Sequence, residues 1–423
     1  MLRNLTFQVF LSAVVAVVLA LVYQTVIPDG SGIVDDTIDL LKSAFLSLLK
    51  MLIAPMIFFS LIGGIISIGN VVRLRSLGGV TVLYYLTTTG FAILLALVAV
   101  FFVHPWTDYP AAMDGVNLDG TVRLLEPSSD SIIAVLGSMA SLAFTNPFSA
   151  LAQLNILGIV TNALLIGIAM VLVLREDSPV IRFVEDANHI IMQILKWVIR
   201  LLPAGIFAIL FDFTIRLSAD TGLGGSFLTQ LLEFALLVVL LTLIHGLVFL
   251  PLVAWIATGT SPVTLIRRIA RPLLVAFSTS SSAATLPVSM RTAEDELGVN
   301  NSVSSFVLPL GATMNMDGTA LFEAVAAIFL AYLYGIELSS VMMITVFLMA
   351  MVASIGAPGM PSASMSGMQM VMLAVGIPLE AIAILLVIER PLDTIRTSVN
   401  VEGDLIGCLV VDRYVNGSNQ EAA

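Results

Sequence analysis

Long charge-free runs dominate the pattern of hydrophobic and polar positions along this chain. They cover residues 4–28, 51–72, 76–107, 131–174, 234–266, 272–290 and 338–379. A helix that crosses a bilayer needs about 20 apolar residues, so most of these runs predict one spanning helix each. The runs 131–174 and 338–379 are too long for one straight crossing, and Pro147 predicts a break within the first of them. A further, more amphipathic helix is predicted at about 180–217, where Lys196 and Arg200 interrupt the apolar pattern.

Two of the runs predict re-entrant hairpins rather than spanning helices. Residues 272–290 have polar residues at both ends and a serine run in the middle, which leaves half-helices too short to cross a bilayer. A hairpin whose tip serines are enclosed by protein satisfies the backbone better. Residues 338–379 repeat this design around "GAPGMPSAS" (356–364), whose glycines and prolines are incompatible with a regular helix.

A polar helix follows each predicted hairpin. The first contains "GATMNMDGTALFEA" (311–324), and the second contains "ERPLDTIRTSVNVEGD" (389–404). A hairpin and a polar helix that occur twice indicate an internal repeat, and broken helices near the membrane midplane are typical of transporter binding sites. In the second segment the helical period places Glu389, Asp393, Arg396 and Asn400 on one face, which Asp404 continues.

Composition excludes several classes of protein. The 423 residues are 58% hydrophobic and 11% charged, with a net charge of −11, which indicates an all-α polytopic membrane protein and argues against a nucleic-acid partner. The apolar runs are continuous, so a β-barrel does not fit. Cys408 is the only cysteine, which excludes an internal disulfide and a thiolate cluster. The three histidines lie far apart and lack the spacing of a zinc site.

Basic residues predict the topology. The N-terminal run is too long for a signal peptide and is predicted to be the first membrane helix. The acidic, lysine-free segment 104–130 is predicted to lie outside and the N-terminus in the cytoplasm. The basic residues on the cytoplasmic side would be Arg3, Arg73, Arg75, Arg175, Arg182, Arg267, Arg268 and Arg271.

The polar residues themselves predict an acidic, zwitterionic ligand and a hard cation. Asp393 and Arg396 lie one turn apart and suit an amino acid with a second carboxylate, because arginine offers a planar fork for that group. Carboxylate, amide and carbonyl oxygens around an unwound helix suit Na⁺.

Four motifs in order resemble the glutamate transporter family, the dicarboxylate/amino acid:cation symporters, in a prokaryotic member. They are "STSSSAATLP" (278–287), "NMDGTA" (315–320), "GAPGMPSAS" (356–364) and "LDTIRTSVNVEGD" (392–404). The resemblance also covers "KMLIAPMIFFSLIGGI" (50–65) and "YYLTTT" (84–89), and so nearly the whole chain. It implies a homotrimer in the cell inner membrane, with about eight transmembrane helices, two hairpins and inverted repeats, in which a transport domain moves like an elevator against a scaffold.

The same resemblance divides the chain. It implies scaffold helices 1 and 2 at 1–75, the third helix and an extracellular loop at 76–130, scaffold helices 4 and 5 at 131–220, the sixth helix at 221–258, the first hairpin at 259–298, the seventh helix with the NMDGT break at 299–336, the second hairpin at 337–379, the eighth helix at 380–414 and a disordered tail at 415–423.

Matched position by position, the resemblance also implies site residues. Asp393 would bind the substrate's amino group and Arg396 its side-chain carboxylate. Further substrate contacts would come from Ser280, Ser281, Ser282, Thr319, Met360, Ser364, Thr397 and Asn400. Na⁺ would be held by Tyr85, Thr88, Thr89, Gly311, Thr313, Asn315, Met316, Asp317, Ser354, Ile355, Ala357, Asn400 and Asp404. Glu323 matches the glutamate that is linked to proton coupling in the animal branch, so H⁺ is a candidate second coupling ion.

Two positions depart from the family's pattern. Archaeal members have an arginine at the tip of the first hairpin, and animal members have a second arginine two residues before the substrate arginine. Here these places hold Ser280 and Thr394. Arg390, one turn before Asp393, is the nearest candidate to compensate.

Other interpretations of the same residues stay open. Asp317 would also suit a helix cap, Arg396 and Asp393 a structural ion pair, Glu323 an inert buried acid, and the serine run close helix packing. Within the family, a C4-dicarboxylate carrier would be expected to lack Asp393, and a neutral amino acid carrier to lack Arg396. An anion channel would not need the pair. An intramembrane serine hydrolase lacks a nearby base, since no histidine lies within 30 residues of the serine run, so we expect no enzyme.

Overall fold

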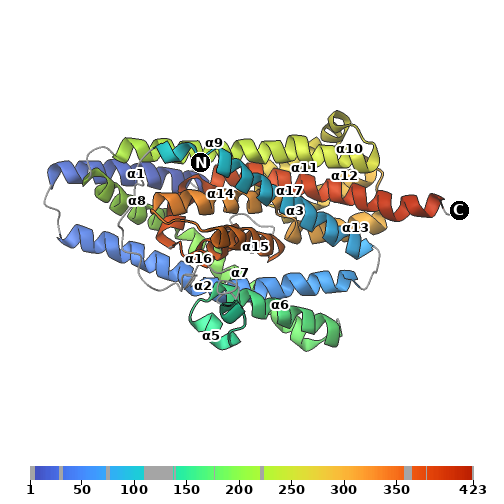
Figure 1. Ribbon diagram of the computed structural model, residues 1–423. Helices are drawn as coiled ribbons and strands as arrows, with labels where there is room; N and C mark the ends of the chain where they lie inside the picture. Colours follow the sequence, from blue (N-terminus) through green and yellow to red (C-terminus); the bar gives the residue numbers. More distant parts are fainter. Residues whose placement is uncertain are drawn as a thin grey trace.

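The computed structural model describes residues 5–27, 32–72, 77–108, 137, 140–175, 177–219, 223–356, 364–377 and 379–421. These residues form helices and no strand (Figure 1). The α-helices are α1 (Leu5–Val26), α2 (Gly32–Val72), α3 (Leu77–Phe102), α5 (Pro147–Ala152), α6 (Ile156–Val173), α7 (Pro179–Arg200), α8 (Leu202–Ala219), α9 (Leu223–Ile244), α10 (Leu250–Thr258), α11 (Pro262–Thr279), α12 (Ser282–Asp295), α13 (Asn301–Met314), α14 (Asp317–Leu333), α15 (Ser340–Gly356), α16 (Ser364–Ala374) and α17 (Leu379–Glu421). A 3₁₀ turn, η1 (Pro105–Asp108), and a π-helical segment, η2 (His245–Phe249), complete them.

Length and apolarity confirm an all-α polytopic membrane protein. Within the described residues, six helices or helix pairs are long and apolar enough to cross a membrane, or seven if the bent pair α7–α8 counts as one span. The prediction was about eight, and α17 is not among those that pass. Its middle carries the charged side chains of the segment 389–404, which the protein interior must accommodate because lipid cannot.

The second helix is longer than its charge-free run predicted. The sequence placed it at 51–72, whereas α2 begins at Gly32 and contains several charged residues. Partners on other helices accommodate these charges: Lys42 Nζ lies 2.6 Å from Asp212 Oδ2 of α8, and Tyr23 of α1 donates a hydrogen bond to Asp35. Lys42 and Asp35 therefore do not end the helix, because each of these two charges has a partner within the bundle.

Prolines and glycines lie at several interruptions of the helices, of which only the one at Pro147 was predicted. Pro147 begins α5, and Asn146 caps that helix by accepting hydrogen bonds from two backbone amides. The segment predicted as one helix at 180–217 is bent by 53° between α7 and α8, and Pro203 lies in the first turn of α8. Gly259 ends α10 in the left-handed conformation, with φ of 74°. The last helix continues to Glu421, whereas a disordered tail was predicted from 415.

The helices lie roughly along one long direction, with two groups on opposite sides (Figure 1). On one side α2 packs against α6 and α7. On the other side α9, α10, α11 and α17 lie together, and α15 and α16 lie between the two groups. Buried apolar side chains form two clusters, of which the smaller is built from α3, α10–α13 and the C-terminal half of α17.

Both predicted hairpin regions contain pairs of helices that pack on each other, α11 with α12 and α15 with α16. All four of these helices contact α14 or α17. The segment α13–α14 is the most enclosed of the long apolar spans, with 89% of its most apolar window buried against 22% for α1. The polar residues of α14 and α17 are therefore surrounded by protein and not by lipid.

Candidate functional site

A break in the helix at Asn315 and Met316 creates the centre of the site. Asn315 ends α13 with φ −106° and ψ 84°, and Met316 precedes α14 with φ −115° and ψ 49°, so neither residue is helical. Pro309 lies just upstream and lacks the amide that a regular helix would use there. The break releases backbone groups from the helix and turns the side chains around it inward.

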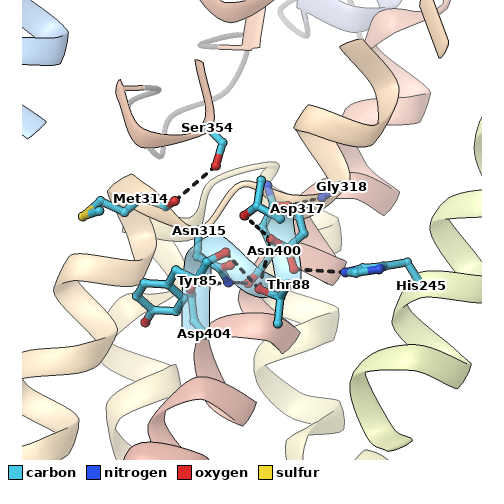
Figure 2. Close-up of polar contacts among 11 residues, drawn as sticks. Tyr85, Thr88, His245, Met314, Asn315, Asp317, Gly318, Ser354, Asn400 and Asp404 are labelled. Atoms are coloured by element: carbon cyan, nitrogen blue, oxygen red, sulfur yellow. Dashed lines mark hydrogen bonds and ion pairs between the residues drawn. The ribbon is translucent and has the colours of Figure 1, made fainter. Parts of the chain in front are cut away.

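Asp317 is the most fully contacted carboxylate of the break (Figure 2). Its Oδ1 accepts hydrogen bonds from Thr89 Oγ1 at 2.6 Å and from Thr88 Oγ1 at 3.4 Å, both on α3. Its Oδ2 lies 3.0 Å from Nε2 of His245 on η2. Asp317 has no exposed surface. Two elements far apart in sequence, α3 and η2, therefore hold one carboxylate in a fixed orientation.

Asn315 connects the break to α17. Its Nδ2 donates hydrogen bonds to Asp404 Oδ1 at 3.0 Å and to the carbonyl oxygen of Asn400 at 3.2 Å. Asn400 in turn accepts a hydrogen bond from the amide of Gly318 at 2.8 Å. The residues Asn315, Asn400 and Asp404 are all at most 3% exposed.

Gly311 allows Asp404 and Tyr85 to approach the helix closely. A side chain at this position would collide with the Asp404 carboxylate and would come within 2.5 Å of Tyr85 Oη. Tyr85 Oη donates a hydrogen bond to the carbonyl oxygen of Val307 at 2.9 Å. The glycine is therefore required by close packing rather than by its backbone conformation.

The donor atoms around the break suit a hard cation. They are carboxylate, amide and hydroxyl oxygens, and Asn315 Oδ1 is buried without a hydrogen-bond partner within the described chain. Among the residues that the structure describes, no group of three or more histidine, cysteine, aspartate or glutamate side chains is placed to hold a metal ion. The set fits Na⁺ as a transported ion.

Most of the residues that were expected to bind Na⁺ lie at this break, and several of them have other contacts. The carbonyl of Gly311 already accepts the helical hydrogen bond from Asn315, and the hydroxyl of Thr313 bonds to Leu310. The hydroxyl of Ser354 donates to the carbonyl of Met314 at 3.2 Å, which joins α15 to the break. The carbonyl of Ile355 lies against Gly64 of α2. Met316 contacts Asn400 through its sulfur. Ala357 lies outside the described residues.

Arg396 forms the second half of the site. Its Nη2 donates hydrogen bonds to Glu389 Oε1 at 2.9 Å and to Asp393 Oδ1 at 3.3 Å. Its guanidinium carbon lies 4.0 Å from the centre of the Phe322 ring, a cation–π contact. All of these groups are buried, so the arginine is neutralised inside the protein.

The remaining expected substrate contacts are partly visible. Thr319 Oγ1 accepts a hydrogen bond from Asn400 Nδ2 at 3.3 Å, and Thr397 is buried on the α17 face. Ser280 forms the turn between α11 and α12 with φ of 50°, Ser281 caps α12, and Ser282 begins it; all three are buried. Met360 lies outside the described residues, and the side chain of Ser364, at the start of α16, is also not described.

Glu323 lies two turns into α14 and has no exposed surface. Neither of its carboxylate oxygens has a hydrogen-bond partner within the described chain. Gly367 of α16 lies so close that any side chain there would collide with the carboxylate. The acid therefore sits between the helix of the break and the second hairpin region.

Sequence reasoning missed two residues of this site. His245 was given no role, although a histidine inside the apolar stretch "LTLIHGLVFL" is itself a signal at membrane depth. Glu389 was placed on the correct face of its helix, but its contact with Arg396 was not predicted.

Comparisons with known proteins show what this chain is similar to. Residues 5–414 match the sodium:dicarboxylate symporter family. An excitatory amino acid transporter of Caenorhabditis elegans is 32% identical over 406 residues, which cover 87% of this chain and 79% of the relative. Excitatory amino acid transporter 2 of Mus musculus is 32% identical over 410 residues, covering 86% and 71%. The neutral amino acid transporter B(0) of Oryctolagus cuniculus is also 32% identical, over 403 residues, covering 89% and 74%.

Proposed function

The chain belongs to the sodium:dicarboxylate symporter family, and from this premise we propose that its substrate is an acidic amino acid, aspartate or glutamate. The chain is a Na⁺-coupled symporter in a membrane. The proposal concerns which substrate it carries, which residues hold that substrate and the ions, and how the assembly moves.

The buried pair of Asp393 and Arg396 carries the substrate assignment. A zwitterion with a second carboxylate needs one anionic group for its ammonium and one cationic fork for its side chain. Asp393 and Arg396 supply both on one face of α17, with Arg396 Nη2 3.3 Å from Asp393 Oδ1. A carrier of C4-dicarboxylates does not need the anionic group, Asp393, because its substrate has no ammonium. A carrier of neutral amino acids does not need the cationic group, Arg396, because its substrate has no second carboxylate.

Asn400 supports coupling between substrate and Na⁺. Its backbone carbonyl accepts a hydrogen bond from Asn315 of the break, and its side chain contacts Gly318 and Thr319. Asn400 also lies one turn after Arg396 on α17. A cation at Asn315, Asp317 and Asp404 would order this segment, and the ordered segment would favour substrate binding at Asp393 and Arg396.

The architecture that we propose follows the family. The protein forms a homotrimer in the inner membrane, with its N-terminus in the cytoplasm, and a transport domain built on both hairpins, α13–α14 and α17 moves against a scaffold. The arginines of α11, α12 and the α6–α7 connection support the cytoplasmic assignment of those ends. Glu323 is proposed to carry a proton with the substrate, which its buried, unbonded carboxylate supports.

Reconstituted protein tests the substrate and the coupling ion together. Purified protein in liposomes should take up labelled aspartate or glutamate when a Na⁺ gradient is imposed, and uptake should stop when Na⁺ is replaced by choline. Succinate and serine should be poor substrates in the same vesicles. Preferred uptake of succinate would indicate a C4-dicarboxylate carrier, and preferred uptake of serine a neutral amino acid carrier such as the rabbit relative is named for.

A further inference from the structure

The guanidinium of Arg396 already has a partner inside the protein that no substrate supplies. Its side chain is 1% exposed, and Glu389, two helical turns earlier on α17, is 3% exposed. The distance from Nη2 to Glu389 Oε1 is 2.9 Å, which is shorter than the 3.3 Å to Asp393 Oδ1. The stronger contact of the arginine is therefore with Glu389 and not with the aspartate beside it.

The geometry of the guanidinium makes this contact significant. A carboxylate can bind a guanidinium through two parallel hydrogen bonds along either of two edges, Nη1 with Nη2 or Nε with Nη2. Nη2 belongs to both edges and has two hydrogens, and Glu389 and Asp393 are two acceptors for them. Nε and Nη1 have no hydrogen-bond partner among the described residues. A ligand carboxylate would thus find one free donor on each edge, but bidentate binding also requires Nη2.

We propose that Glu389 is an internal carboxylate that neutralises Arg396 in the substrate-free site and competes with the substrate's side-chain carboxylate for Nη2. Asp393 releases Nη2 more readily, since its contact is longer and its proposed partner is the substrate's ammonium, whereas the shorter contact with Glu389 remains to compete with the substrate. Glu389 is therefore the residue that limits affinity for acidic substrates and allows their release. This inference rests on the proposed acidic substrate.

Two physical effects follow from such a competitor. A buried arginine without a counter-charge would be costly, so Glu389 stabilises the empty carrier. Binding then exchanges one carboxylate for another, and only the difference between the two contacts contributes to affinity. A residue that merely oriented Arg396 would have the opposite effect, because its removal would weaken the grip on the substrate.

Equilibrium binding to the purified full-length protein separates these two roles. Labelled aspartate binding is measured at saturating Na⁺ for the wild type and for Glu389→Gln, which keeps shape and removes charge. We expect the Kd for aspartate to fall about tenfold, the size of one charge-assisted hydrogen bond, and dissociation to slow. The affinity for serine, measured by displacement of aspartate, should change less than about twofold, because serine has no side-chain carboxylate to bind Arg396.

Two further variants serve as controls. Glu402→Gln removes a carboxylate that is also buried on the same helix, but its side chain lies against Gly246 and not Arg396. The ratio of aspartate to serine affinity should stay at the wild-type value. Glu389→Asp keeps the charge and shortens its reach, so it should also tighten aspartate binding, by less than Gln does. This variant decides the question if Glu389→Gln does not fold.

Three results would overturn the inference. One is unchanged or weaker aspartate binding in both Glu389 variants. Another is an equal gain for aspartate and serine, which would indicate a general change of the site. The third is a wild type that binds neither aspartate nor glutamate, and only this result would also refute the proposed substrate.

Discussion

His245 Nε2 lies 3.0 Å from Asp317 Oδ2, and neither side chain has any exposed surface. The histidine comes from η2, a π-helical segment, and its ring stacks on Phe249 with a centroid distance of 5.1 Å. Phe91 of α3 stacks on Phe249 in turn. A π-bulge rotates the side chains that follow it and is frequent at functional sites. Here it aims the ring at the carboxylate, so that one oxygen of Asp317 faces His245 (Figure 2). The other oxygen accepts a hydrogen bond from Thr89.

His245→Leu should therefore raise the Na⁺ concentration needed for half-maximal substrate binding, by about tenfold. Without its partner on Oδ2, the Asp317 carboxylate loses the orientation that presents it to a cation. His245→Gln, which keeps a donor, should recover part of the loss. A Na⁺ titration of aspartate binding measures the effect, with the exposed His189→Leu as control. Equal Na⁺ requirements in His245→Leu and the control would contradict the positioning role.

Asp317→Asn and Asp404→Asn should each weaken Na⁺ dependence, by at least about tenfold in the Na⁺ requirement. Each substitution removes one negative charge from an oxygen cage and hardly changes its volume. Assembly should be intact, which size-exclusion chromatography in detergent checks. Unaltered Na⁺ titrations in both variants would exclude these carboxylates as ion ligands.

Arg396→Cys should convert the carrier from acidic to small neutral substrates. Aspartate affinity should fall on the order of a hundredfold, because the substrate's second carboxylate would be left unpaired in a closed site. The same change leaves Glu389 without its ion pair, so the double variant Glu389→Gln/Arg396→Cys provides the better-folded comparison. Competition of serine and aspartate for uptake measures the switch, and wild-type aspartate affinity in both variants would refute the role of Arg396.

Glu323→Gln should preserve substrate exchange while making net uptake insensitive to an imposed pH gradient. The amide mimics the protonated acid and keeps its shape beside Gly367, whereas it cannot release a proton. The measurement is uptake into liposomes at a fixed Na⁺ gradient, with and without a pH step. A wild type that ignores the pH step, or a variant that still responds to it, would leave Glu323 as a structural acid.

The sequence by itself determined the elements of this protein. Apolar runs of spanning length, the serine run at 278–282 and the break at "NMDGT" are local features, and each follows from what a backbone needs inside a bilayer. The shared face of Glu389, Asp393, Arg396 and Asn400 is also local, because the helical period alone defines it. Charge-free runs were less reliable for boundaries, since α2 begins well before its run does.

Only the tertiary structure decided which polar groups meet. Lys42 lies inside a membrane helix because Asp212, 170 residues later, provides its counter-charge. His245 contacts Asp317 across 72 residues because α9, which leads into η2, packs beside α14. Arg396 pairs more closely with Glu389 than with Asp393, although both lie on its own helix face, and Phe322 of another helix covers the guanidinium. Contacts between helices depend on how the helices pack, which the spacing of residues along the chain does not determine.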